Sequence, residues 1–215
     1  MIPAARFLVV LDADSTLIEN EVIELLADAA GSLALVAEVT DRAMRGELDF
    51  AASLRERVAT LAGLSTDVFA EVGALIRPTP GVHALIEGLH AAGNRIGVVS
   101  GGFHELLDPL AETLGLDHWR ANRLEVSDGR LTGGLVGPII DASAKAKALT
   151  EWAELDGIDL CSTVAVGDGA NDLTMMRVAG LGIAFNAKPI VRQHADLVID
   201  SADLSQVLPV LGLRG

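Results

Sequence analysis

Five short apolar runs, separated by segments with helical periodicity, constrain the fold of this chain more than any other feature. The runs are RFLVVL (6–11), RIGVVS (95–100), TVAVG (163–167), LGIAF (181–185) and DLVI (196–199). Their continuous Val, Ile and Leu content is typical of strands covered on both faces, as in parallel sheets. Helical patterns lie between most of them, at 81–92, 103–115, 143–155, 170–179 and 188–194. This alternation predicts an α/β fold with a doubly wound, mostly parallel sheet and right-handed crossovers.

One long segment departs from the alternation. Residues 17–77 show helical patterns almost throughout, and no apolar strand run interrupts them. Because the segment directly follows the first strand, we predict a small helical cap inserted there, with RPTPG (77–81) as its exit linker. The predicted core domain then comprises residues 1–16 and 78–215, and the cap domain comprises residues 17–77.

A second departure is the segment NRLEVSDGRLTGGLVGP at residues 122–138. Apolar residues alternate with polar ones on both sides of its Ser-Asp-Gly, and this tripeptide is typical of a tight β-turn. We therefore predict a β-hairpin over this segment.

The net charge, the first apolar run and the cysteine count limit the partners and the compartment that we expect. The formal net charge of the 215 residues is −14, which leaves no basic stripe for a nucleic-acid backbone. The first apolar run is far shorter than a membrane-spanning helix and leads into acidic residues, so we expect neither a signal peptide nor a membrane partner. The single cysteine, Cys161, fits a reducing compartment, and we expect a cytoplasmic protein.

Three of the predicted strands lead into residues that packing alone does not require. The first run continues as LVVLDADSTL, with Asp12 and Asp14, and the third leads into GDGAND, with Asp168 and Asp172. The second run ends at Ser100, within VVSGGF. In open parallel sheets, ligands bind in the crevice outside the carboxyl ends of the strands. We therefore expect these five residues to converge on one site.

Four carboxylates in one crevice repel one another unless protons or a cation compensate their charge. A divalent cation removes this difficulty, and ligation by oxygen atoms without His or Cys favours Mg²⁺ over Zn²⁺. Mg²⁺ usually binds one or two carboxylates together with water and substrate phosphate. We therefore expect Mg²⁺ as the cofactor and a phosphate group on the substrate.

A bound phosphate also needs hydrogen-bond donors. Ser100 offers a hydroxyl, and the two glycines after it let backbone N–H groups approach closely at a helix start. The segment SAKAKALTEW begins the next helix and offers a lysine. The candidate phosphate ligands are Ser100, Gly101, Gly102, Asn171 and Lys145, or Lys147 in its place.

In this order, the motifs resemble those of the haloacid dehalogenase superfamily of phosphotransferases. They are Asp12-Ala13-Asp14-Ser15-Thr16, Ser100, the lysine near 145, and Gly167-Asp168-Gly169-Ala170-Asn171-Asp172. Within the superfamily, the chain resembles the phosphoserine phosphatase family along its length. The stretches that carry this resemblance include DADSTLIENEVIELLA, AMRGELDFAASLRERV, ANRLEVSDGRLTG and VAVGDGANDLTMMRVAGLGIAFNAKP.

The resemblance implies a Rossmann-like core and Mg²⁺-dependent hydrolysis of O-phospho-L-serine to L-serine and phosphate, the last step of serine biosynthesis. Asp12 would be the nucleophile that forms an aspartyl-phosphate, and Asp14 the general acid and base. Lys145 would neutralise charge during the reaction. The metal ligands would be Asp12, the backbone carbonyl of Asp14, and Asp168, with Asp172 supporting them through water or hydrogen bonds.

The cap would supply recognition of the amino acid. By resemblance, Glu21 would hold the substrate ammonium group and Arg57 its carboxylate, while Met44 and Phe50 would shield the substrate from water. Two features depart from the family pattern. Ala13 stands where larger apolar residues are common, and no N-terminal regulatory domain is expected, so feedback by serine through such a domain is not expected either.

The residues leave other functions open. The same covalent chemistry could transfer the phosphoryl group to another alcohol, such as homoserine or a sugar, or hydrolyse another small phosphomonoester. A non-enzymatic receiver-like module would use Asp12 only as a phosphate acceptor, but needs no long cap. A serine hydrolase would need a Gly-x-Ser-x-Gly elbow, which VSGGF does not provide. The expected partner is O-phosphoserine, and the expected state is a monomer or homodimer.

Overall fold

Seven strands form one sheet in the computed structural model, which describes residues 6–45 and 47–213. The order across the sheet is β4-β3-β2-β1-β5-β6-β7, and every neighbouring pair is parallel except β3 with β4. This arrangement confirms the predicted α/β class with a mostly parallel sheet. The strands are β1 (Leu8–Leu11), β2 (Arg95–Phe103), β3 (His118–Ser127), β4 (Arg130–Val136), β5 (Thr163–Gly167), β6 (Leu181–Phe185) and β7 (Leu197–Ile199).

Both faces of the sheet are covered, as the continuous apolar runs predict. Val9 and Leu11 point into one hydrophobic cluster, and Leu8 and Val10 point into a second cluster on the other face. The first cluster includes apolar residues of α5 (Val82–Ala91), α6 (His104–Leu114) and α10 (Val207–Val210). The second includes apolar residues of α7 (Ala142–Asp156), α8 (Leu173–Val178) and α9 (Pro189–Arg192).

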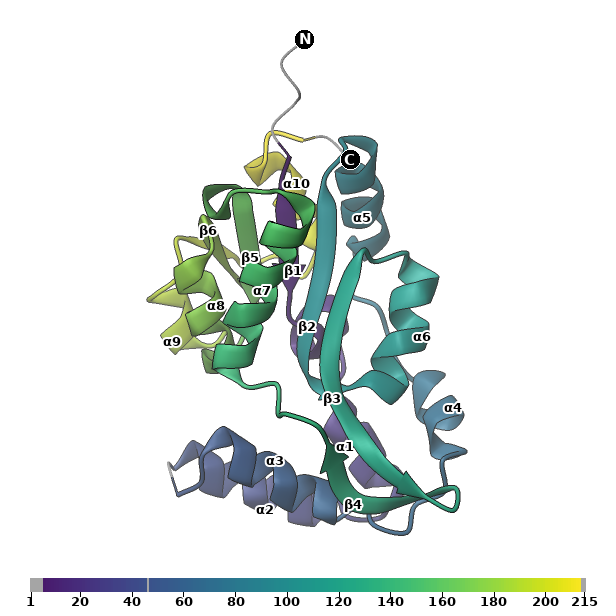
Figure 1. Cartoon of the computed structure of the whole chain (residues 1–215). Coiled ribbons are helices and arrows are strands. Elements are labelled where there is room, and N and C mark those ends of the chain that lie inside the picture. The colour runs from purple at the N-terminus through teal and green to yellow at the C-terminus, as the bar shows by residue number, and fades with distance from the viewer. Residues whose placement is uncertain (1–5, 46, 214–215) are drawn as a thin grey trace.

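The segment after β1 is helical, as predicted. It contains α1 (Val22–Ala29), α2 (Leu33–Met44), α3 (Phe50–Ala59) and α4 (Val68–Gly73). Figure 1 shows α2 and α3 at the lower end of the molecule, away from the helices that cover the sheet. The two chain segments that lead to and from these helices lie side by side, because Ile18 pairs with Pro78 in an isolated bridge. The domain boundaries at 16/17 and 77/78 stay a prediction.

The predicted hairpin is present and is formed by β3 and β4. Its turn residues Asp128 and Gly129 have φ values of 51° and 73°, the left-handed conformation that a tight hairpin turn requires. Figure 1 shows both strands extending beyond the rest of the sheet toward α3. There, the N–H of Gly63 donates to the carbonyl of Leu131 at 2.8 Å, which joins the hairpin to the helical region.

The structure corrects several predicted bounds. β3 starts at His118, before the predicted hairpin segment 122–138, because residues 118–120 pair with β2 without forming an apolar run. The strand predicted over 95–100 continues to Phe103. The helix predicted over 170–179 begins with a tighter turn before α8, and the one predicted over 188–194 is only the four residues of α9. Within the described ranges, no helix combines the length and apolar character needed to cross a membrane.

Candidate active site

Asp12 is the first residue after β1, and the core fixes both its backbone and its side chain. Its N–H donates to the carbonyl of Val166 in β5 at 3.0 Å. Its Oδ1 accepts from the N–H of Ala13 at 2.6 Å, and the residue is only 5% exposed. Because β1 lies between β2 and β5, this carboxylate lies beyond the carboxyl end of a central strand of the sheet.

After Asp12, the chain makes one wide turn that brings Asp14 to the same cavity. The turn spans Ala13–Leu17 and is closed by two backbone hydrogen bonds of 3.0 and 3.3 Å. Ser15 has a φ of 56°, in the left-handed region that non-glycine residues seldom adopt. Oδ1 of Asp14 accepts weakly from the N–H of Val22 at 3.4 Å. Asp14 therefore lies between the edge of the sheet and the start of α1.

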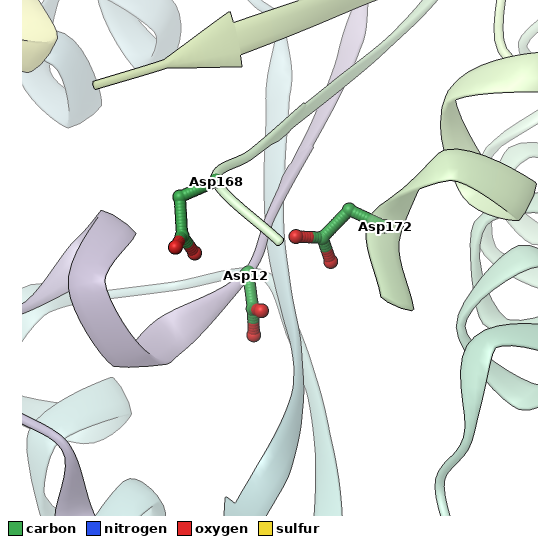
Figure 2. A group of neighbouring side chains, drawn as sticks. All are labelled: Asp12, Asp168 and Asp172. Atoms are coloured by element: carbon green, nitrogen blue, oxygen red, sulfur yellow. The ribbon is translucent and has the colours of Figure 1, made fainter. Parts of the chain in front are cut away.

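Two further carboxylates gather beside Asp12 (Figure 2). Asp168 directly follows β5, and Asp172 ends the short turn that leads into α8. One oxygen atom from each of the three side chains lies within 4.8 Å of those from the other two. These three aspartates could hold a divalent cation, since carboxylate oxygens suit a hard ion.

Lys145 supplies a positive charge to these acids. Its side chain is fully buried, and its Nζ lies 2.6 Å from Oδ2 of Asp12 and 2.8 Å from Oδ1 of Asp172. The second oxygen of Asp172 accepts from the N–H of Gly169 at 3.0 Å. Lys145 lies in the first turn of α7, which Asp141 caps by accepting from the N–H of Ala144. The helix start therefore holds the ammonium group between two buried carboxylates.

Burial and the remaining negative charge raise the pKa values of Asp14, Asp168 and Asp172. Burial, together with the charges of Glu21 and Asp12, raises the pKa of Asp14 well above its usual value. Burial and the charge of Asp12 raise the pKa of Asp168 to about 6, and the same causes raise the pKa of Asp172. Burial alone would lower the pKa of Lys145, but Asp12 and Asp172 raise it, so the lysine stays a cation. Protons or a metal ion must compensate the excess charge.

The segment Ser100–Gly102 borders the same site. The hydrogen-bond ladder between β2 and β3 is irregular between Val99 and Phe103. Within this irregular part, the N–H of Gly102 donates to Oγ of Ser100 at 2.8 Å. A Cβ atom on Gly102 would lie 3.1 Å from that oxygen and 3.5 Å from Oδ2 of Asp14. Glycine therefore allows the backbone to approach the side chain of Asp14 closely.

A cavity of about 100 Å³ connects these groups with the helical region. Glu21, at the start of α1, and Arg57 of α3 line it together with Asp12, Asp14 and Asp168. Other residues that line it include Ile23, Phe50, Leu54, Gly101 and Gly102. A Cβ atom added to Gly101 would lie 3.0 Å from Cζ of Phe50, so this ring packs directly over Gly101 in the glycine loop (Ser100–Gly102).

Glu21 and Arg57 present one acid and one base to the cavity from the helical side. Oε1 of Glu21 accepts from the hydroxyl of Ser15 at 2.7 Å. Nε of Arg57 donates to the carbonyl of Ser53 at 3.3 Å. Burial lowers the pKa of Arg57, while the charges of Glu21 and Asp14 act in the opposite direction. This wall could bind a ligand that carries both a cationic and an anionic group.

The structure brings together most of the residues predicted for the site. Lys145 contacts the acids, whereas Lys147 is 72% exposed and pairs with Glu151 on the surface, so Lys145 is the lysine that reaches the site. The side chain of Met44, at the end of α2, lies outside the described part of the structure. At the cavity, or in contact with residues that line it, lie Asp12, Asp14, Glu21, Phe50, Arg57, Ser100, Gly101, Gly102, Lys145, Asp168, Asn171 and Asp172. Their roles stay a prediction.

Lys188 and Ser15 both contact predicted site residues but were not themselves predicted. Lys188 lines the cavity, with Nζ 3.8 Å from Oδ2 of Asp168. It follows β6, so the rule that ligands bind beyond the carboxyl ends of parallel strands could have found it. Ser15 lies inside the first motif, but its hydrogen bond to Glu21 depends on a turn that the sequence does not reveal.

With its fold and its acid cluster, the chain belongs to the haloacid dehalogenase-like hydrolase family, whose profile matches residues 9–177. Curated relatives extend the similarity. A phosphoserine phosphatase of Streptococcus thermophilus is 51% identical over 204 residues, which cover 95% of both chains. A phosphoserine phosphatase of Streptomyces coelicolor is 54% identical over 209 residues, which cover 97% of this chain and 51% of the relative. The chain thus spans nearly all of some relatives and about half of others.

Solved structures agree with the sequence matches. A phospho-aspartyl intermediate analogue of phosphoserine phosphatase has a TM-score of 0.90 and 43% identity, covering 96% of this chain and 99% of that chain. A substrate-bound phosphoserine phosphatase complex also has a TM-score of 0.90 and 43% identity, covering 95% of this chain and 98% of that chain. The fold described above is therefore the fold of these enzymes.

Proposed function

We propose that this chain is a phosphoserine phosphatase, which hydrolyses O-phospho-L-serine to L-serine and phosphate. The observation that carries the proposal is a single cavity with two chemically different walls. One wall has the carboxylates Asp12 and Asp14 beside a glycine loop, and the other has Glu21 and Arg57. The 51% identity to a phosphoserine phosphatase over nearly the whole of both chains supports the same substrate.

Asp12 is the proposed nucleophile. A carboxylate oxygen of Asp12 forms the new bond to phosphorus as the bond between phosphorus and the serine oxygen breaks, which leaves an aspartyl-phosphate. The buried ammonium group of Lys145, 2.6 Å from this carboxylate, supports the assignment because it offsets charge on the reacting groups. In the second half of the reaction, water attacks phosphorus and Asp12 leaves as a carboxylate.

Asp14 is the proposed general acid and base. Its raised pKa favours the protonated form before the reaction. The protonated Asp14 can then donate its proton to the departing serine oxygen. The resulting carboxylate then accepts a proton from the water that cleaves the aspartyl-phosphate. The two proton transfers balance over one turnover and return Asp14 to its starting state.

The proposed cofactor is Mg²⁺. The oxygen-only donor set fits this ion, and the raised pKa values of Asp168 and Asp172 indicate a site that favours added positive charge. Asp12, the backbone carbonyl of Asp14, and Asp168 would hold the ion, and Asp172 would support it while binding Lys145. When bound, it would offset the negative charge of the phosphoryl group.

The helical wall is the proposed recognition surface for the amino acid. Glu21 would bind the ammonium group of phosphoserine, and Arg57 would bind its carboxylate. Phe50 and Met44 would exclude water from the bound substrate, which strengthens the electrostatic contacts inside the cavity. The position of Phe50 over Gly101 supports this role for the phenylalanine.

From the net charge of −14 and the single cysteine, we further propose a cytoplasmic enzyme without nucleic-acid or membrane partners.

Phosphate release from a panel of phosphomonoesters tests the proposal. The panel comprises both enantiomers of phosphoserine, phosphothreonine, phosphoethanolamine, a sugar phosphate and an activated aryl phosphate, each with and without Mg²⁺. We expect the highest kcat/KM for O-phospho-L-serine, and loss of turnover when a chelator removes the metal. An equal rate for phosphoethanolamine would contradict amino-acid recognition. A new phosphoester formed after homoserine is added would identify a phosphotransferase instead.

A further inference from the structure

Asn122 of β3 is a buried polar residue that the proposed mechanism does not use. It is 2% exposed and joins two segments that are distant in the sequence. Its Nδ2 donates to the carbonyl of Gly101 at 2.8 Å, and its Oδ1 accepts from the N–H of Ile140 at 2.8 Å. The carbonyl can only accept and the N–H can only donate, so these two partners fix the orientation of the amide.

The hydrogen bond from Asn122 to Gly101 takes the place of a missing ladder hydrogen bond between β2 and β3. The regular pairing of β2 with β3 ends at Val99 and returns where Phe103 faces Asn122. Between these points, Ser100–Gly102 faces the single residue Ala121, so the two strands cannot match group for group. The side chain of Asn122 supplies a donor to Gly101 within this bulge, where the half-buried carbonyl would otherwise lack a ladder partner.

This contact determines where the next N–H group points. In a trans peptide, the C=O and N–H bonds point in opposite directions, and no cis peptide occurs in the described residues. Because the carbonyl of Gly101 points to Asn122, the N–H of Gly102 points away from it. That N–H donates to Oγ of Ser100, and Gly102 lines the cavity with Asp12 and Asp14.

The hydrogen bond from Ile140 to Asn122 lies next to the start of α7, the helix that carries Lys145. Ile140 directly precedes Asp141, which caps α7. Asp141 in turn accepts, through its backbone carbonyl, from the N–H of Lys145 at 2.9 Å. One buried side chain therefore ties the glycine loop to the start of the helix that carries Lys145.

We propose that Asn122 is a positioning residue for the phosphoryl group. It holds the Gly101–Gly102 peptide at the wall of the cavity, with the N–H of Gly102 directed to Oγ of Ser100, and it fixes this loop relative to α7. The inference rests on the proposed phosphatase activity, but not on serine as the alcohol. It predicts that Asn122 affects binding of the phosphoryl end of any substrate and not recognition of the amino acid.

The variant Asn122→Asp tests this role, and Asn94→Asp is its matched control. Asn94 is also 2% exposed, and its Oδ1 accepts from the N–H of Phe7 at 2.8 Å, at the opposite end of the sheet. At pH 8 an ionised aspartate keeps the acceptor oxygen at either position and loses the amide donor. Only at position 122 does this loss release a carbonyl of the glycine loop.

With Mg²⁺ present, we expect Asn122→Asp to weaken competitive inhibition by inorganic phosphate by about 5- to 150-fold. The value of kcat/KM should fall by a common factor for phosphoserine and for an activated aryl phosphate. Inhibition by L-serine, which lacks a phosphoryl group, should stay unchanged. Asn94→Asp keeps the acceptor for the N–H of Phe7 and should keep its affinity for phosphate.

Retained phosphate affinity in a folded Asn122→Asp variant would overturn the inference, as would a loss confined to phosphoserine. A measurement on the unaltered chain covers the case in which the variant does not fold. The amide resonance of Gly102 should shift when inorganic phosphate and Mg²⁺ are added, and an unchanged resonance would also overturn the inference. An unaltered chain that hydrolyses no phosphomonoester would refute the proposed function itself, a result distinct from these.

Discussion

The two walls of the cavity hold their charged side chains in different ways. On the sheet edge, Asp12, Lys145 and Asp172 are 5%, 0% and 0% exposed and are joined by contacts of 2.6 and 2.8 Å. On the helical wall, Glu21 and Arg57 are partly exposed, and both bond to neutral groups, a serine hydroxyl and a backbone carbonyl. The first wall is a tightly coupled set of charges, and the second is not.

We expect this difference to separate the residues that act in the reaction from the residues that recognise the amino acid. Removing Lys145 from the sheet edge leaves Asp12 and Asp172 buried without their shared cation, so the effect should extend to every substrate and to stability. Removing the charge of Arg57 from the helical wall should weaken only the binding of the ligand group that this charge contacts. Five substitutions, from the largest expected effect to the smallest, test whether the two walls are separable in this way.

The largest effect is expected for Asp12→Asn. The amide is not a nucleophile for phosphorus, so turnover of phosphoserine and of an activated aryl phosphate should both be abolished. The similar shape of asparagine should leave the fold intact. Phosphate release measures the first expectation, and circular dichroism with a melting curve controls for the second. Substantial turnover in the folded variant would reject Asp12 as the nucleophile.

Asp14→Asn should slow phosphoserine hydrolysis by about 10²–10⁴-fold, the usual contribution of acid–base catalysis. An activated aryl phosphate has a leaving group that needs no proton, so formation of the aspartyl-phosphate from it should slow much less. Burst kinetics with the aryl substrate separate the two half-reactions. A near-normal rate with phosphoserine would exclude Asp14 from proton transfer.

Lys145→Met should lower the free energy of unfolding of the metal-free protein by about 3–5 kcal/mol, because Asp12 and Asp172 lose their shared cation. Lys147→Met, at a 72% exposed side chain, is the matched control and should change it by less than about 0.5 kcal/mol. Denaturant titration compares the two variants. Equal values would show that the charges of the sheet edge are not coupled as the distances indicate.

Arg57→Ala should lower kcat/KM for phosphoserine by about 10- to 150-fold, as expected for loss of a hydrogen-bonded charge. The rate with an activated aryl phosphate should change little, since this substrate has no carboxylate. Arg55→Ala, at an exposed position of the same helix, serves as the control. An equal loss with both substrates would remove Arg57 from amino-acid recognition and would break the separation of the two walls.

The smallest effect is expected for Ser15→Ala, which removes the 2.7 Å hydrogen bond to Glu21. The KM for phosphoserine should rise by about 2- to 10-fold, the contribution of one neutral hydrogen bond. In a double-mutant cycle with Glu21→Gln, the two effects should not add, because both act on the same carboxylate. Additive effects would mean that Ser15 does not orient Glu21.

Much of the fold could be predicted from the apolar runs. Their alternation with helical patterns predicted five strands of the sheet, and Ser-Asp-Gly predicted the hairpin turn. The first part of β3 was missed because His118, Trp119 and Arg120 are all partly exposed and show no apolar run. Their strand conformation comes from pairing with β2, a contact between segments that are not adjacent in the sequence.

The two walls of the candidate site differ in how many of their residues could be predicted without the family resemblance. The rule about strand ends found Asp12, Ser100 and Asp168 from the residues alone. Glu21 and Arg57 came only from resemblance to a family, because an acid and a base on a helix are ordinary surface residues. Lys188 and Asn122 were missed, since their contacts join segments that no local pattern relates.

The sequence by itself determined the alternation of strands and helices and the presence of acids at the strand ends, because both depend on local residue order. The tertiary structure decided which charges meet. The sequence favoured Lys145 and kept Lys147 as an alternative, and the folded helix directs Lys145 to Asp12 and Lys147 to the surface. Likewise, only the irregular pairing of β2 with β3 gives the buried amide of Asn122 a carbonyl to hold. Such contacts arise when distant segments pack, and no local pattern contains them.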